Sequence, residues 1–151
     1  MRNPQQIALG NLSRTILSWP AKESPVFVGA NVTVTGNLAD TGDVGVLWAP
    51  MTGQRFLLRG GHLAILAITA CTGQGSGILF LCDGVATRVV MPLACIDFGM
   101  PASTVIADSL VFDLNAGFYG KNAGGKLRIG SNGTIGTGVI RICGVLWGDE
   151  Y

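Results

Sequence analysis

The sequence predicts an all-β domain, an antiparallel sandwich of two sheets with a jelly-roll-like course, preceded by an extended N-terminal arm. Two observations support this prediction. From residue 26 onward, short β-rich runs alternate with clusters of Gly, Asn and Asp, a pattern typical of a sandwich or barrel of many strands. Gly supplies 23 of the 151 residues, which indicates many turns. We therefore divide the chain into an arm at 1–25 and a β-sandwich domain at 26–151.

The first half of the domain is expected to form strands rich in β-branched residues, each closed by a turn cluster such as Asp40-Thr41-Gly42-Asp43. Pro50 fits the end of a strand, because proline cannot donate a hydrogen bond to a central ladder. The longest strand alternates apolar residues on both of its faces, so both faces are expected to be buried. The predicted strands are 26–28, 32–35, 44–48, 55–59 and 62–71.

The second half continues the same pattern. Asp83-Gly84 lies between two apolar runs and is a strong signal for a tight hairpin. The Gly-rich segment 73–77 and the Gly- and Asn-rich segment 115–125 are interpreted as loops. The predicted strands are 78–82, 85–91, 95–98, 109–114, 126–129 and 139–147. We expect these eleven β-rich runs to form eight to ten strands in all, in two sheets that bury each other's apolar faces.

The arm at 1–25 mixes polar and apolar residues at a spacing that fits neither a strand nor a helix cleanly. We interpret it as extended, with one short helical turn at 11–17. Two alternatives stay open: the segment packs on its own domain as a first strand, or it lies on a neighbouring subunit. The candidate interaction residues are the apolar members of the arm: Ile7, Leu9, Leu12, Ile16, Leu17 and Trp19.

Charge and hydropathy argue for a protein partner. Charged residues make up 13% of the chain, ten Lys and Arg nearly cancel nine Asp and Glu, and the mean hydropathy is +0.47. Such a surface offers no electrostatic field for nucleic acid or anionic lipid, and it would aggregate as a free monomer. The longest apolar run, at 63–70, is far shorter than the roughly 20 residues of a membrane helix. The first residues also lack the apolar core of a secretory signal, so Met1 is taken as the start.

A catalytic site is not predicted. A Ser-His-Asp arrangement would have to use the single histidine, His62, and no G-x-S-x-G motif accompanies it. The Gly-rich loop at 73–77 precedes a strand rather than a helix, so it does not match a phosphate-binding loop and no cofactor is expected. Four carboxylates are expected to be solvated or to cap turns, with no pair brought together for acid–base chemistry: Asp83, Asp97, Asp108 and Asp113.

The four cysteines do not have the spacing of a metal site. Each lies in an apolar run, where a free cysteine behaves as a small buried hydrophobe. We therefore expect free thiols, with a disulfide as the alternative, since an intracellular protein seldom keeps one. The cysteines are Cys71, Cys82, Cys95 and Cys143.

Four segments of the domain follow one another in a distinctive order and spacing. They are Leu47-Trp48-Ala49-Pro50-x-x-Gly53-x-x-Phe56-x-Leu58 before the strand at 62–69, then Leu79-Phe80-Leu81-Cys82-Asp83-Gly84, Ile96-Asp97-Phe98-Gly99, and 139–147 with Asp149-Glu150. Together these segments resemble small β-sandwich proteins encoded among bacteriophage virion genes. The resemblance covers residues 44–151 and leaves the arm outside. Proteins of this kind are similar to capsid decoration (cement) proteins and head-fibre domains, which are commonly trimeric jelly rolls without catalytic residues.

The resemblance implies a virion structural protein, not an enzyme. We expect a homotrimer that binds the major capsid protein lattice on the capsid exterior and stabilises the head after assembly in the host cytoplasm. The alternative is a tail-fibre or receptor-binding tip that holds a host molecule on loops such as 115–125.

Overall fold

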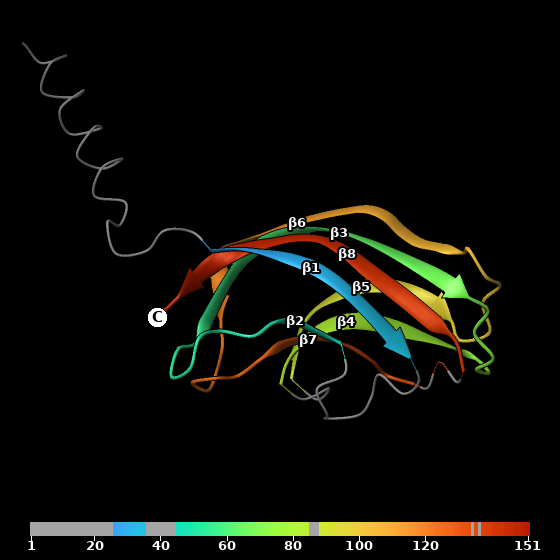
Figure 1. The fold of residues 1–151 in the computed structure, drawn as a ribbon, viewed down its shortest axis with the longest axis horizontal. Coiled ribbons are helices and arrows are strands. Elements are labelled where there is room, and N and C mark those ends of the chain that lie inside the picture. Colours follow the sequence, from blue (N-terminus) through green and yellow to red (C-terminus); the bar gives the residue numbers. More distant parts are fainter. Residues whose placement is uncertain (1–25, 36–44, 85–87, 134, 136) are drawn as a thin grey trace, which may run out of the picture.

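The computed structural model describes residues 26–35, 45–84, 88–133, 135 and 137–151, with the backbone alone for 26–35. These residues form strands and loops, and no helix is found among them. Figure 1 shows the strands stacked in two layers. The strands are β1 (Val26–Thr35), β2 (Val46–Trp48), β3 (Phe56–Thr69), β4 (Ser76–Asp83), β5 (Val89–Asp97), β6 (Val105–Tyr119), β7 (Leu127–Ser131) and β8 (Val139–Glu150).

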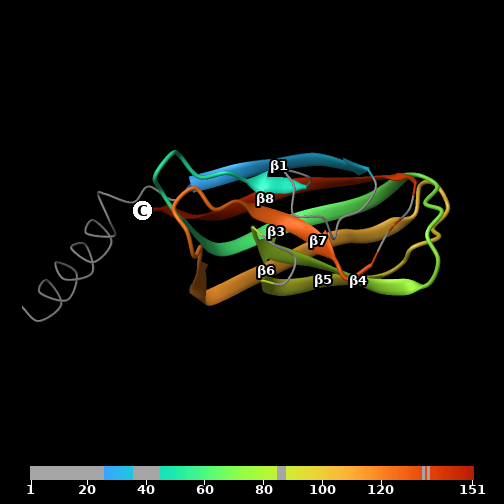
Figure 2. The same ribbon diagram turned by 90° about the horizontal axis from the view of Figure 1, so that it is seen from below.

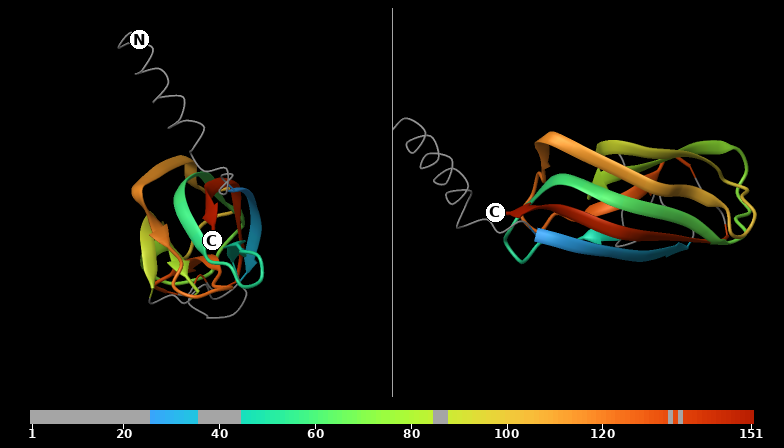
Figure 3. Two further views of the ribbon diagram at one scale, coloured as in Figure 1. Left: turned by 90° about the vertical axis from the view of Figure 1, so that its left-hand side faces the viewer. Right: turned by 90° about the horizontal axis from the view of Figure 1, so that it is seen from above.

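The pairing of these strands confirms the predicted jelly roll. Antiparallel pairs join β1 to β8, β2 to β7, β3 to β6 and β4 to β5, so the chain forms one long ribbon of nested hairpins. Two further pairs, β3 with β8 and β4 with β7, roll this ribbon into two sheets. Sheet A has the order β1-β8-β3-β6 and sheet B the order β2-β7-β4-β5. The right panel of Figure 3 shows sheet A from above, and Figure 2 shows sheet B from below.

Some strand boundaries differ from the sequence prediction, because glycines that were expected to form turns lie inside strands and allow close packing there. The predicted strands 55–59 and 62–71 form the single strand β3, which runs through Gly60 and Gly61. A Cβ at Gly60 would lie 2.7 Å from the ring of Trp147, and one at Gly61 would lie 2.6 Å from the ring of Phe112. The two glycines therefore admit aromatic rings of the neighbouring strands. The segments 26–28 and 32–35 likewise merge into β1.

Two predicted connections differ in the structure: the turn between β4 and β5, and the loop between β6 and β7. Asp83-Gly84 is not a tight two-residue turn: Cys82 pairs with Val89, and the Asp83 amide donates to the Arg88 carbonyl at 3.0 Å. The predicted loop at 115–125 is wrong in its first part, because β6 continues to residue 119. Gly117, with φ of 69°, allows this strand to change register and pair again with β3.

Asp83 was expected to be solvated or to cap its turn, and the structure shows a buried carboxylate with specific partners. Its side chain is only 4% exposed, forms an ion pair with the Arg88 Nε at 3.1 Å and accepts a hydrogen bond from the Lys121 amide at 2.9 Å. Arg128 on β7, which pairs with Cys82, is also buried and donates to the Gly84 carbonyl at 2.9 Å. The carboxylate thus ties the ends of β4 and β6 together. Asp97, Asp108 and Asp113 are exposed, as expected.

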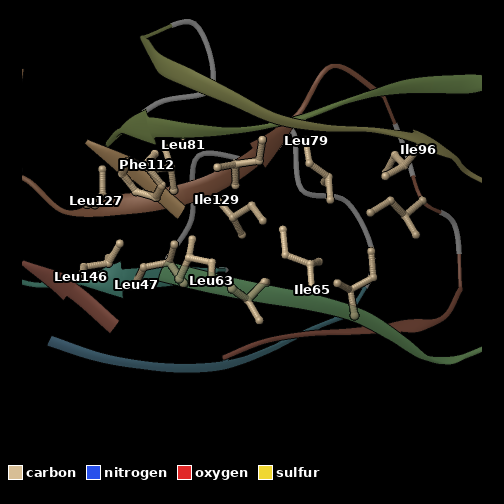
Figure 4. Close-up of a cluster of buried hydrophobic side chains, with 14 of the residues drawn as sticks. Leu47, Leu63, Ile65, Leu79, Leu81, Ile96, Phe112, Leu127, Ile129 and Leu146 are labelled. Atoms are coloured by element: carbon tan, nitrogen blue, oxygen red, sulfur yellow. The ribbon is translucent and has the colours of Figure 1, made fainter. Parts of the chain in front are cut away.

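The hydrophobic core fills the space between the two sheets, as the close-up in Figure 4 shows. Leu63 and Ile65 from sheet A face Leu79 and Leu81 from sheet B, all at most 1% exposed. Burial of one such side chain contributes about 1.5–3 kcal/mol to the free energy of unfolding.

The acidic end of β8 closes one end of the sandwich. Glu150 accepts a hydrogen bond from the Trp48 indole at 2.8 Å and one from the Met51 amide at 3.1 Å. Asp149 is buried and pairs with Arg59 at 2.6 Å. These contacts connect the last strand to β3 and to the segment after β2, so both carboxylates have structural partners.

Candidate binding groove

The outer faces of the two sheets differ in exposure. In the centre of sheet B, the residues that alternate with core leucines are buried: Phe80 and Cys82 on β4 and Arg128 on β7. On sheet A the outward residues of β6 are open to solvent, with Val105 exposed to 59% and Val111 to 65%, and the outward Arg141 and Cys143 of β8 are also exposed. Apolar surface of this kind on one face marks a place of contact with another molecule.

The prediction that both faces of β3 are buried is therefore wrong for its outer face. Leu63, Ile65 and Ala67 lie in the core, whereas Ala64 and Leu66 between them are only half-buried. The alternation of apolar residues predicted two apolar faces, but only one of them is covered by the partner sheet.

Two adjoining hollows lie along this outer face, with volumes of about 290 Å³ and about 210 Å³. They share Ala64, Asp108 and Cys143 and so form one groove, which we call the β3 groove. The small side chain of Ala64 lowers its floor, while β6 and β8 supply its walls. Its lining side chains are His62, Ala64 and Leu66 from β3, Val105 and Asp108 from β6, and Arg141, Cys143 and Val145 from β8.

A β-bulge in β6 places polar groups at this groove. Leu63 pairs with Leu110 and Ile65 with Ala107, so Asp108 and Ser109 both stand opposite the single residue Ala64. Both are exposed, and the Ser109 hydroxyl lies 2.8 Å from Nε2 of His62. The sequence contained no signal for this pair, because the two residues are 47 positions apart and a bulge decides which way Ser109 points.

A serine hydroxyl next to an imidazole is the start of a nucleophilic site, but such a site needs more. The imidazole must be oriented through its second nitrogen, and donors must await the oxyanion. Among the described residues, Ser109 is the only hydrogen-bond partner of the His62 imidazole, and Asp108 lines the same hollow without bonding to the ring. The pair can bind a polar group through a hydrogen bond.

The cysteines divide into two classes, which corrects the expectation that all four are buried. All four are free thiols. Cys71 and Cys82 are buried, and burial raises the pKa of both thiols. Cys143 in the β3 groove and Cys95 on the edge strand β5 are exposed.

We expect two fast-reacting thiols and two slow ones in the folded protein in dilute solution at pH 8. The thiolate is the reactive form, so the raised pKa values and the burial of Cys71 and Cys82 both slow their modification. Labelling with a maleimide, followed by peptide mass spectrometry, should find Cys95 and Cys143 modified first. Addition of urea should equalise the four rates. Fast modification of Cys82 without denaturant would contradict this assignment.

The described part of the chain contains no group of three or more His, Cys, Asp or Glu side chains placed to hold a metal ion. It also contains no helix with the length and hydropathy to cross a membrane. The six apolar residues of the arm, Ile7 to Trp19, lie outside the described residues, as does the predicted helical turn at 11–17.

Comparison with protein-family models, with curated proteins and with solved structures finds no match to this chain.

Proposed function

We propose that the protein is a virion structural protein of the capsid decoration class, which binds the major capsid protein lattice and stabilises the head. The observation that carries the proposal is the open apolar face of sheet A, in a sandwich whose opposite face has buried central residues. A jelly roll hosts many functions, so the fold is compatible with this proposal without deciding it.

The weak charge of the chain fits attachment through many modest contacts. A trimer on a lattice that repeats its binding site gains avidity even when each contact is weak. Val111, which is exposed and lies outside the β3 groove, supplies an apolar contact of this strength without strong electrostatics. In this proposal the protein resides on the capsid exterior.

The location test is immunogold electron microscopy of virions with an antibody raised against the purified protein. Gold label at many positions over the head would support a decoration protein. Gold confined to the tail tip would refute it and favour the receptor-binding alternative, and unlabelled virions would contradict both.

Charge placed in the apolar part of the arm should abolish attachment. The full-length double variant Ile16→Asp/Leu17→Asp is expected to lose at least about tenfold in affinity for particles that lack the protein, because two carboxylates must be desolvated at the contact. Co-sedimentation with such particles measures the loss. The matched control is Ser13→Asp/Ser18→Asp, which adds the same charge at polar positions and should bind almost normally. Equal binding by both variants would show that the arm does not mediate attachment.

A further inference from the structure

We propose that the β3 groove receives the apolar arm, residues 7–19, of a second copy of this chain. This inference deepens the proposed function, on which it rests for the role of the arm, by naming the surface to which the arm binds. It concerns contacts between copies, and these can form with or without a capsid.

The groove has the size and polarity for apolar side chains. A cavity of about 150 Å³ in another protein holds a benzene molecule. The larger hollow here measures about 290 Å³, which is room for a leucine or an aromatic ring. Leu66 and Val105 line the second hollow, whose walls are mainly apolar. Insertion of arm residues such as Leu12 and Trp19 would remove apolar surface of both partners from water.

The arm is long enough to follow the whole groove. An extended chain of 25 residues reaches up to about 80 Å. The part of β3 that lines the groove runs from His62 to Leu66 and spans about 15 Å at roughly 3.3 Å per residue. The apolar part of the arm, 13 residues from Ile7 to Trp19, is longer than this and can cover the groove completely. About 6 residues then remain to connect it to β1.

The point where the arm joins the domain favours a second copy over the same copy. Val26 pairs with Gly148 at the end of sheet A, and β1 runs inward from there (Figure 1). In the sequence Pro25 precedes it, and a proline disfavours helical backbone at the residue before it, so an immediate reversal is not expected there. To reach its own groove, the arm would have to turn back and cross β8, which lies between β1 and β3.

The charges of the arm match only the β6 side of the groove. The arm carries the basic residues Arg2, Arg14 and Lys22 and one acidic residue, Glu23. The β6 side of the open face carries the exposed Asp108 and Asp113, whereas the β8 side carries the exposed Arg141, so the basic residues of the arm are expected to lie toward β6. Complementary charge of this kind sets orientation and register more than affinity.

The test uses Cys143 as a reporter inside the groove and Cys95, exposed on sheet B, as the internal control. Purified full-length protein is labelled with a maleimide at increasing protein concentration, and the modification of each thiol is followed by mass spectrometry. If the arm of a second copy fills the groove in about nine molecules of ten, Cys143 should react about tenfold more slowly than in dilute protein. Cys95 should react at one rate throughout.

The arm variants then identify what covers the groove. Ile16→Asp/Leu17→Asp should restore fast labelling of Cys143 at high concentration, whereas Ser13→Asp/Ser18→Asp should leave it protected. Protection of Cys143 in samples that sedimentation analysis shows to be monomeric would show that a chain occupies its own groove and would overturn the proposal. Protection that persists in the first variant would assign the cover to another surface, and no protection at all would leave the groove empty; either result overturns it too. No virion enters this experiment, so its failure is distinct from a failure of attachment to capsids.

Discussion

Gly148→Ala is expected to lower the free energy of unfolding by about 3 kcal/mol or more, the upper end of what overpacking usually costs. A Cβ at position 148 would overlap the carbonyl oxygen of Leu57 and touch the ring of Trp48 at 3.1 Å. Gly148 pairs with both Val26 and Leu58, so its backbone lies between two neighbours and cannot move away from either. The overlap is with backbone rather than a flexible side chain, so the β8–β3 pairing must open to admit the methyl group.

Urea unfolding followed by tryptophan fluorescence measures the change. The control is Gly124→Asn in an exposed turn, where φ is 72° and an added Cβ meets nothing within 4 Å. Asparagine tolerates this conformation, so a change within about 1 kcal/mol is expected there. Equal stability of Gly148→Ala and the wild type would show that β8 and β3 do not pair in the register described here.

Phe56→Ala should cost about 3–5 kcal/mol, the range found for removal of a buried aromatic ring. Phe56 has no exposed surface, and its ring lies 5.8 Å from that of Trp48 and 6.3 Å from that of Phe118. It therefore joins β2, β3 and β6 at one end of the sandwich. Its removal leaves a cavity between two sheets that are held by their backbone pairing and cannot collapse fully.

The matched control is Tyr119→Ala on β6. Tyr119 is 57% exposed and has an edge-on ring contact with Tyr151 at 5.6 Å, so its loss should cost about 0.5–1.5 kcal/mol. Both variants remove one aromatic ring, and the difference between them isolates the effect of burial. Thermal or urea unfolding that ranks Tyr119→Ala as the more damaging change would contradict the packing of this end of the sandwich.

The sequence was a good guide wherever the controlling interactions are local. β-branched runs and turn clusters located all eight strands at least in part, although the second half of β6 was predicted as a loop. The free thiols were also expected. Predictions failed where a glycine or a carboxylate had a distant partner. In the sequence Gly60 and Gly61 suggest a turn, whereas in the structure they make room for the rings of Trp147 and Phe112. Asp83 suggests a hairpin residue, whereas in the structure its carboxylate binds Arg88 and the Lys121 amide.

The candidate site was beyond local inference for a related reason. The alternation of side chains along β3 shows that the strand has two apolar faces. Which of these faces is covered depends on strands that are distant in the sequence. The groove also depends on the bulge that sets Asp108 and Ser109 opposite Ala64. Insertion of one residue into a ladder is a property of the pair of strands, so neither strand's sequence reveals it alone.

The sequence by itself determined that this chain is all-β, rich in turns and weakly charged, with a mean hydropathy that is unfavourable for a free monomer. These properties follow from composition and from residue types at short spacing. Tertiary structure alone decided that β1 pairs with β8 and β2 with β7, that the outer face of sheet A stays open while the centre of sheet B is buried, and that Cys143 lies in a groove. The physical reason is that nested pairing joins residues about a hundred positions apart, and no local pattern of side chains specifies a partner at that distance.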